Sequence, residues 1–239
     1  DQTTLAIVSE AAFRTTDFET LQTIMTTTSI VPGPTFLLPS WLFRRLPTRV
    51  KRNAKIARDA IQRPLDKVLQ QTREEGAPAD GNGRSLVDYF AFSKDMSPTT
   101  VLDQAVTFVF AGHETTSTAI NWTLYYLARH TAVQAKLLEE LTACFGRDAT
   151  PQLGDVEQLP YLGSVIKEVL RVQPPVFHVI RVAKEDDVLP SGVFIPKGSQ
   201  VFVSVYGVHY NPNVWGPTVD EFRPERWEDP DLPDRLGLC

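Results

Sequence analysis

The stretch SPTTVLDQAVTFVFAGHETTSTAINWTLYYLARH, residues 97–130, decides the fold that this sequence predicts. Ser97 is a favourable N-cap residue, and Pro98 suits a first turn, where no intrahelical backbone donor is needed. An apolar-rich pattern then continues to about His130. A helix of this length is unusual in a globular protein, so we expect it to be central and largely buried.

The centre of this helix, FAGHETTST at 110–118, is poorly suited to helix stability. Gly112 costs about 1 kcal/mol relative to Ala, and the nearby threonine hydroxyls can bond back to the preceding turn. Ala111 and Gly112 lower the helix surface, so that a large flat group can lie against it. Thr115 follows Ala111 by one turn and shares its side. Glu114 beside this hydroxyl predicts a proton relay.

The small residues of this stretch also fit a purely structural role. A helix packed closely on another through Ala111 and Gly112 would show the same pattern, with Glu114 on a polar seam, and this alternative stays open. His113 and Glu114 match the start of the zinc-binding pattern HExxH, but Ser117 stands where the second histidine is required. The pattern therefore argues against a metal-dependent hydrolase.

Downstream, the spacing of apolar residues predicts two more helices and then a change from helical to strand periodicity. One helix covers 131–145 and ends at Gly146, and the other covers 161–172 and is stopped by Pro174 and Pro175. Residues 176–206 predict short strands separated by Gly-containing turns. Residues 210–239 form a meander rich in Pro and Trp.

Upstream, the sequence predicts a helix up to about residue 28 and another over 50–69, where apolar residues recur at helical spacing. Pro64 within the second helix predicts a kink or a break. Nine basic residues stand against two acidic ones between Arg44 and Lys67. A solvated helix face explains these basic residues. A membrane-surface patch explains them too, with Trp41, Leu42 and Phe43 in the membrane interface.

The bulk composition indicates a globular chain. It has 239 residues, a net charge of -5 and 42% hydrophobic residues, which gives no general attraction for nucleic acid. Its two cysteines offer neither a disulfide framework nor a zinc-type pair. There is no apolar run of membrane-spanning length. Because it begins with Asp1 rather than Met, we expect a processed chain or a fragment, organised as a single partial domain over 1–239.

Three motifs, in this order and at these intervals, resemble the cytochrome P450 family of haem-thiolate monooxygenases. AGHETTS (111–117) is similar to the oxygen-activating helix, KEVLR (167–171) to the buried Glu-x-x-Arg, and FRPERW (222–227) to the Pro-Glu-Arg-Phe segment, with Trp227 in place of Phe. The resemblance is strongest from 97 to 227. It implies a mainly α-helical fold with small β-sheets, present as an incomplete copy.

The resemblance implies roles for individual residues. Glu114 and Thr115 would be the acid–alcohol pair that supplies protons for dioxygen cleavage. Ala111 and Gly112 would border the haem, and Arg181 would pair with a haem propionate. A structural ionic cluster and a substrate pocket complete the implied site, made of Glu168, Arg171 and Arg226 in the cluster and Val176, Phe177 and His178 in the pocket.

The resemblance also implies partners and a location. The intact protein would use haem, O2 and an apolar small-molecule substrate, and NADPH indirectly through an electron-donating reductase. The loop at 36–47 would rest on a bilayer, which implies association with the endoplasmic reticulum membrane. No nucleic acid partner is implied.

Cys239 departs from the family's ligand pattern. Leu232 stands seven residues before it, where the family has Phe, and Arg235 stands four before, where the family has Gly. We therefore expect no metal ligand in this chain, Cys239 included, and no activity of this chain alone. The alternative function is a haem-free, inactive helical protein or interaction module.

Overall fold

The computed structural model describes residues 2–13, 49–76, 86–93, 95–146 and 153–232, and these residues are mostly helical. They form two compact units, one through Glu114 and one from Thr115. The predictions for 14–48 and for the last seven residues, Cys239 among them, lie outside the described residues.

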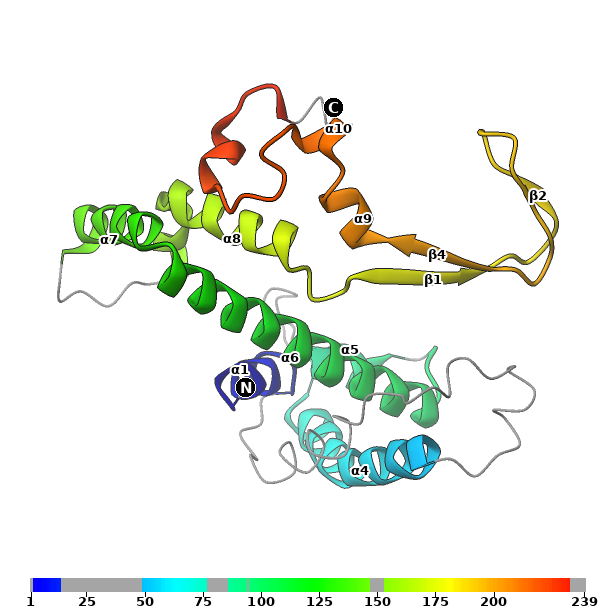
Figure 1. Cartoon of the computed structure of the whole chain (residues 1–239). Helices are drawn as coiled ribbons and strands as arrows, with labels where there is room; N and C mark the ends of the chain where they lie inside the picture. The colour runs from blue at the N-terminus through cyan, green and yellow to red at the C-terminus, as the bar shows by residue number, and fades with distance from the viewer. Residues whose placement is uncertain (1, 14–48, 77–85, 94, 147–152, 233–239) are drawn as a thin grey trace. The chain divides into compact units, whose positions relative to one another are not determined.

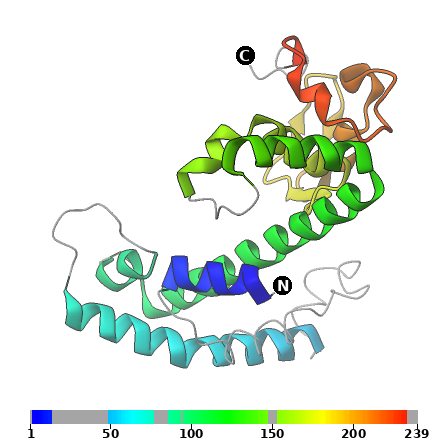
Figure 2. The same ribbon diagram turned by 90° about the vertical axis from the view of Figure 1, so that its left-hand side faces the viewer.

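The predicted long helix is present as α6, Pro98–Arg129. The Ser97 hydroxyl accepts a hydrogen bond from the Thr100 backbone N–H at 3.1 Å, which confirms the predicted N-cap. The chain reverses at His130 into α7, Thr131–Phe145 (Figure 2), which ends at Gly146 with a φ of 73° as the glycine predicted.

The expectation that α6 is largely buried is wrong for its second half. Ile120 and Leu124 are 46% and 61% exposed. Further along the helix, Tyr126 stacks on Phe222 at 4.6 Å and Leu127 packs against a small core. The described residues of its unit therefore cover only part of the apolar surface of this helix half.

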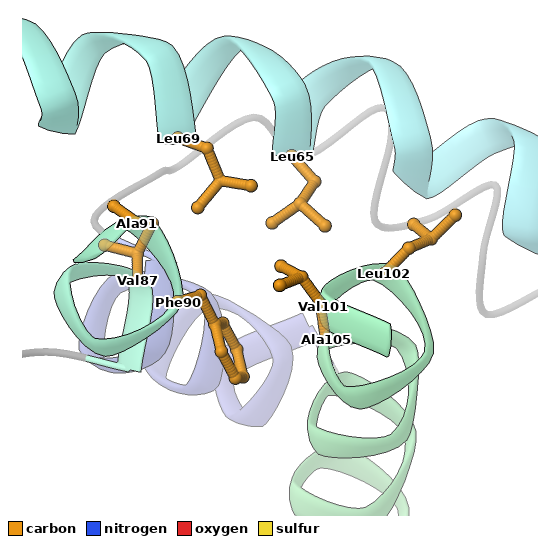
Figure 3. Close-up of a cluster of buried hydrophobic side chains, with 8 residues drawn as sticks. All are labelled: Leu65, Leu69, Val87, Phe90, Ala91, Val101, Leu102 and Ala105. Atoms are coloured by element: carbon orange, nitrogen blue, oxygen red, sulfur yellow. The ribbon is translucent and has the colours of Figure 1, made fainter. Parts of the chain in front are cut away.

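The core of the first unit lies between three helices: α4 (Arg49–Glu75), α5 (Leu86–Phe92) and α6. Leu65 and Leu69 of α4 point toward α5 and the start of α6 (Figure 3). The buried side chains that they meet are Val87, Phe90, Ala91, Val101, Leu102 and Ala105. A fourth helix, α1 (Gln2–Phe13), contacts α5.

Of the kink or break predicted at Pro64, the break is wrong, because α4 runs through this residue as one helix of 27 residues. Proline removes one backbone donor from the helix, and its ring crowds the carbonyl four residues earlier. Leu65 and Leu69, both buried, attach the helix to α5 just after the proline. Packing of this apolar stripe outweighs the local cost. The basic side chains of α4 that are described, Arg52, Lys55, Lys67 and Arg73, are exposed, which agrees with a solvated face and equally with a membrane-surface patch.

The second unit begins with the end of α6 and continues through short elements (Figure 1). They are, after α7, η2 (Leu153–Gln158), α8 (Pro160–Val172), β1 (His178–Val182), β2 (Asp187–Val188), β3 (Phe194–Ile195), β4 (Gln200–Ser204), α9 (Val205–His209), α10 (Pro212–Trp215) and η3 (Pro224–Glu228). β1 pairs with β4 and β2 with β3, both antiparallel. The mainly helical fold with small sheets is therefore confirmed.

The strand prediction for 176–206 is wrong at its end. Val205–His209 is the short helix α9, and the Ser204 hydroxyl caps it by accepting the Gly207 N–H at 3.0 Å. The two predicted turns are present, with Gly192 at φ 83° and Gly198 at φ 85°. These left-handed values favour glycine.

The ribbon of β1 and β4 exposes apolar side chains on both faces. Ile180 pairs with Phe202, and they are 41% and 54% exposed. Val203 faces the other side, because neighbouring residues of a strand alternate, and it is 49% exposed. A ribbon of only two strands is marginally stable by itself.

The described helices include none that is both long enough and apolar enough to cross a membrane.

Candidate functional site

Helix α8 places a glutamate and an arginine in the interior of the second unit. Its apolar residues recur at helical spacing and are buried, as Tyr161, Val165, Val169 and Val172. Glu168 and Arg171 are three residues apart and therefore fall on the same face. They are 0% and 1% exposed. Full burial of two charged groups requires that each be paired.

The Glu168 carboxylate accepts five hydrogen bonds. Its Oε1 accepts from Arg171 Nη2, Arg226 Nε and the Arg223 backbone N–H, each at 2.9 Å. Its Oε2 accepts from Arg171 Nε and Trp227 Nε1, each at 3.0 Å. The structure thus brings Glu168, Arg171 and Arg226 together, and it adds Trp227, to which sequence reasoning gave no role.

Arg171 uses all of its N–H donors. Besides the two bonds to Glu168, Nη1 donates to the carbonyls of His209 at 3.1 Å and Val219 at 2.8 Å. Nη2 also donates to the Glu221 carbonyl at 3.0 Å. A guanidinium has five N–H donors, so none remains unsatisfied. One side chain of α8 therefore fixes three points of the following meander.

Arg226 fixes the meander a second time. Its Nη2 donates to the carbonyls of Thr218 at 2.7 Å and Glu221 at 3.0 Å. The cluster holds two cations and one anion, so these carbonyl dipoles offset the excess positive charge. A buried cluster adds little net stability, but breaking it is costly, which favours one arrangement of the chain.

The end of α8 is contacted by His209 of α9 and by residues from the start of the predicted meander. His209 Nδ1 lies 3.0 Å from the Arg171 carbonyl, and the Tyr210 hydroxyl donates to the Val172 carbonyl at 3.1 Å. Burial raises the pKa of Tyr210 to about 12, so its phenol stays protonated and can donate. The rings of Tyr210 and Trp215 lie 5.6 and 5.3 Å from the Arg171 guanidinium carbon.

A second polar cluster connects α7, the start of α8 and η3. Glu225 Oε1 accepts from Tyr161 Oη at 2.8 Å and Lys136 Nζ at 3.0 Å. The Glu140 carboxylate accepts the backbone N–H groups of Tyr161 at 2.7 Å and Leu162 at 2.9 Å. Glu140 therefore acts as the missing cap of α8, whose N-cap residue forms no side-chain hydrogen bond.

We predict a pH-dependent effect of Glu225→Gln. Burial alone would raise the pKa of Glu225, but its backbone hydrogen bond, Tyr161 and Lys136 together lower it below 4.5. A lowered pKa contributes stability above 4.5 that is lost as the pH falls through the folded value. The variant should therefore be less stable at pH 7, by about 0.5 kcal/mol because the pair is partly exposed, and the difference should shrink as the pH is lowered toward 2.

Urea denaturation at both pH values measures this difference. The control is Glu228→Gln, because the Glu228 carboxylate lies 3.6 Å from Lys136 and is 55% exposed. If Glu225→Gln lowered the free energy of unfolding by the same amount at both pH values, the stabilisation by Glu225 would not be electrostatic.

The predicted relay residues lie in the middle of α6. Glu114 is exposed, Thr115 is half-buried and Ala111 is exposed. His113 is 7% exposed, and burial lowers its pKa, so its imidazole is neutral at pH 7.

Gly112 faces a neighbouring helix. A Cβ atom at this position would lie 3.2 Å from Val8 Cγ2 of α1, closer than ordinary contact. The close-packing alternative that the sequence left open therefore accounts for the glycine. It does not account for Ala111, which stays exposed.

The ribbon carries the predicted propionate partner and one pocket residue. Arg181, in β1, is exposed and donates to the Ile180 carbonyl at 2.9 Å, with no salt bridge to any carboxylate in the described part of the chain. His178 precedes it by three residues and therefore lies on the opposite face. Phe177 is 60% exposed and its ring is 4.4 Å from that of His178, while Val176 is 49% exposed.

The chemistry of these side chains fits the periphery of the haem that the resemblance implies. Arg181 has an exposed guanidinium with a single hydrogen bond within the described part of the chain, to the adjacent carbonyl, which suits a propionate, and Ala111 is a small exposed residue, which suits a flat ring. The described residues include no group of three or more potential metal ligands. Their one cysteine, Cys144, is exposed on α7, with Sγ 3.8 Å from the Gln158 carbonyl.

Comparison with known proteins identifies the family. The family model described as cytochrome P450 matches residues 7–235. Cytochrome P450 4F6 of Rattus norvegicus is 35% identical over 202 residues, covering 77% of this chain and 37% of the relative. Cytochrome P450 3A31 of Mesocricetus auratus is 42% identical over 172 residues, covering 67% of this chain and 34% of the relative.

Solved structures agree with the sequence relatives. A zebrafish cytochrome P450, determined with abiraterone, matches with a TM-score of 0.73 and 28% identity, over 96% of this chain and 53% of its own. The chain thus spans about a third of the length of these curated relatives and about half of the matched structure. A family match over nearly the whole chain, together with the cluster built from KEVLR and FRPERW, shows that the chain belongs to the cytochrome P450 family.

Proposed function

We propose that this chain is part of a haem-dependent monooxygenase that inserts one oxygen atom of O2 into an apolar organic substrate. The family match over residues 7–235 carries this proposal. The buried cluster around Glu168 supports it, because a fixed meander suits a protein that must hold a large flat cofactor. The whole protein's activity is proposed here, since the chain spans only part of its relatives.

The proposed reaction sets a clear task for the residues of α6. One oxygen atom enters a C–H bond of the substrate, and the other leaves as water, which consumes two electrons and two protons. Haem, when bound, supplies the redox chemistry. Glu114, exposed on α6, would take up protons from solvent, and the Thr115 hydroxyl would pass them inward.

We further propose the partners and the location. The electrons would come from NADPH through a reductase, and Arg181 would hold a haem propionate. Val176, Phe177 and His178 would contact the substrate. The intact protein would associate with the endoplasmic reticulum membrane. The exposed apolar and aromatic side chains before and within β1 support an apolar ligand.

The decisive experiment is a reduced, CO-bound absorption spectrum. It is recorded on the polypeptide encoded when the reading frame is followed past Cys239, where we expect Phe-x-x-Gly-x-Arg-x-Cys-x-Gly. A thiolate-type Soret band supports the proposal. A stop codon directly after Cys239, and no haem bound by the expressed protein, would favour the alternative of a haem-free interaction module.

The 239 residues by themselves are proposed to give no thiolate-type band. Cys144 lies on α7 close to a backbone carbonyl, and Cys239 lacks the flanking residues of the ligand loop. Cys144→Ser and Cys239→Ser test each thiol separately. A thiolate band that disappears only in Cys239→Ser would overturn this part of the proposal.

In the intact monooxygenase we predict that Thr115→Ala uncouples oxygen consumption from product. Removal of a positioned proton donor typically costs about 10²–10⁴-fold in the assisted step. The amount of product per O2 should therefore fall at least about tenfold, with peroxide formed instead. The control is Thr116→Ala, whose side chain is exposed on the same helix. Equal coupling in both variants would remove the assignment of Thr115.

A further inference from the structure

The indole of Trp227 reaches the centre of the buried cluster. Its Nε1–H donates to Glu168 Oε2 at 3.0 Å. The only other hydrogen bond that Oε2 accepts among the described residues comes from Arg171 Nε, whereas Oε1 accepts three. Trp227 thus supplies half of the donors to one of the two carboxylate oxygens.

The ring of Trp227 lies near the side chains of Trp215 and Lys167. It packs against Trp215 in an edge-type arrangement, with ring centroids 5.5 Å apart and planes at 62°. Lys167 Nζ lies 5.9 Å from its centroid. Since an indole has a single N–H and no acceptor, a ring fixed in this way aims its donor in one direction.

The side chain at this position decides whether the donor exists. The segment that FRPERW resembles ends in Phe, whose ring fills similar space but has no polar hydrogen. In this chain the aromatic position therefore has two tasks, because it packs on Trp215 and also donates to the anion. A hydrogen bond to an ionised group is worth more than one between neutral groups.

We propose that Trp227 is a positioning residue, whose indole N–H fixes the rotation of the Glu168 carboxylate and thereby the alignment of Arg171 and Arg226. Rotation about the last side-chain bond of Glu168 breaks bonds at both oxygens, and the indole N–H is one of the two bonds that oppose it at Oε2. Without the indole N–H, the Arg171 Nε donor alone resists rotation at Oε2, so the orientation of the carboxylate is held less firmly. This inference does not depend on the proposed reaction, because it concerns the cluster itself.

The test compares Trp227→Phe with Trp215→Phe in the full chain. Trp215 is a matched control, since its Nε1 donates to the Val208 carbonyl at 3.1 Å, a neutral acceptor, and its ring belongs to the same small core. We expect Trp227→Phe to lower the folding equilibrium constant about 10- to 100-fold, measured by urea denaturation. In a Glu168→Gln background this effect should shrink at least threefold, and the effect of Trp215→Phe should not.

A measurement on the parent chain covers the case in which Glu168→Gln does not fold. In the ¹H–¹⁵N spectrum, the Trp227 indole signal is assigned by its loss in Trp227→Phe. We expect its N–H to exchange with solvent at least about tenfold more slowly than the indole of free tryptophan. Exchange at the free rate, or an effect of Trp227→Phe that is unchanged by Glu168→Gln, would overturn the proposal.

Discussion

Replacing Glu168 by Gln is expected to destabilise the second unit by about 3–5 kcal/mol, the cost of removing one partner from a buried ion pair. Gln keeps the size of the side chain but removes its charge. Arg171 and Arg226, 1% and 4% exposed, would then share the interior with no anion from Glu168. The new amide NH2 would also face donors where an acceptor is required.

Urea denaturation followed by circular dichroism measures this loss. The matched control is Glu139→Gln, because Glu139 is an exposed residue of α7. Surface substitutions of this kind usually change stability by less than about 0.5 kcal/mol. A loss below about 1 kcal/mol for Glu168→Gln would show that the guanidinium groups need only the backbone carbonyls.

The second large effect is expected for Arg171→Lys, which keeps the charge. Arg171 donates five hydrogen bonds, two to Glu168 and the others to the carbonyls of His209, Val219 and Glu221. A lysine ammonium has three donors on a compact head, so at least two of these hydrogen bonds are lost. The Glu168 oxygens and the Glu221 carbonyl have other donors, so the carbonyls of His209 and Val219 are the acceptors at risk. Each unsatisfied buried acceptor costs about 1–3 kcal/mol. We therefore expect a loss of about 2–5 kcal/mol.

The control for this substitution is Arg181→Lys. Arg181 is exposed, and its hydrogen bond goes to the adjacent Ile180 carbonyl. This change should therefore leave the free energy of unfolding within about 0.5 kcal/mol of the parent. If Arg171→Lys were equally mild, charge alone would hold the meander, and the planar shape of the guanidinium would be unimportant.

Local signals were enough to predict several boundaries of α6, α7 and α8. Ser97 and Pro98 marked the start of α6, Gly146 the end of α7, and the prolines after Val172 the end of α8, and each lies at or next to the observed boundary. Such signals work because a helix end has unpaired backbone groups that only certain residues satisfy. The helix α9 was missed because its valines have high strand propensity, while its cap is a single serine hydroxyl.

The contacts within the two polar clusters needed the structure. Glu168 and Arg171 were predictable neighbours, because they are three residues apart on one helix. Trp227 and Glu168 are 59 residues apart, and Tyr161 and Glu225 are 64 apart, so no periodicity connects them. The resemblance supplied Arg226 as a partner of Glu168. It gave no reason to expect Trp227, whose contribution depends on how its ring is oriented.

The β1–β4 ribbon has a practical consequence for work with this chain. From Gln200 to Val208 the sequence QVFVSVYGV contains no charged residue and no proline, and its Phe202 and Val203 are about half exposed. Short uncharged segments of this kind at an unprotected strand edge are the usual starting points of aggregation. Phe202→Lys, at an exposed position of β4, should keep the expressed chain monomeric for longer, which light scattering during refolding would measure.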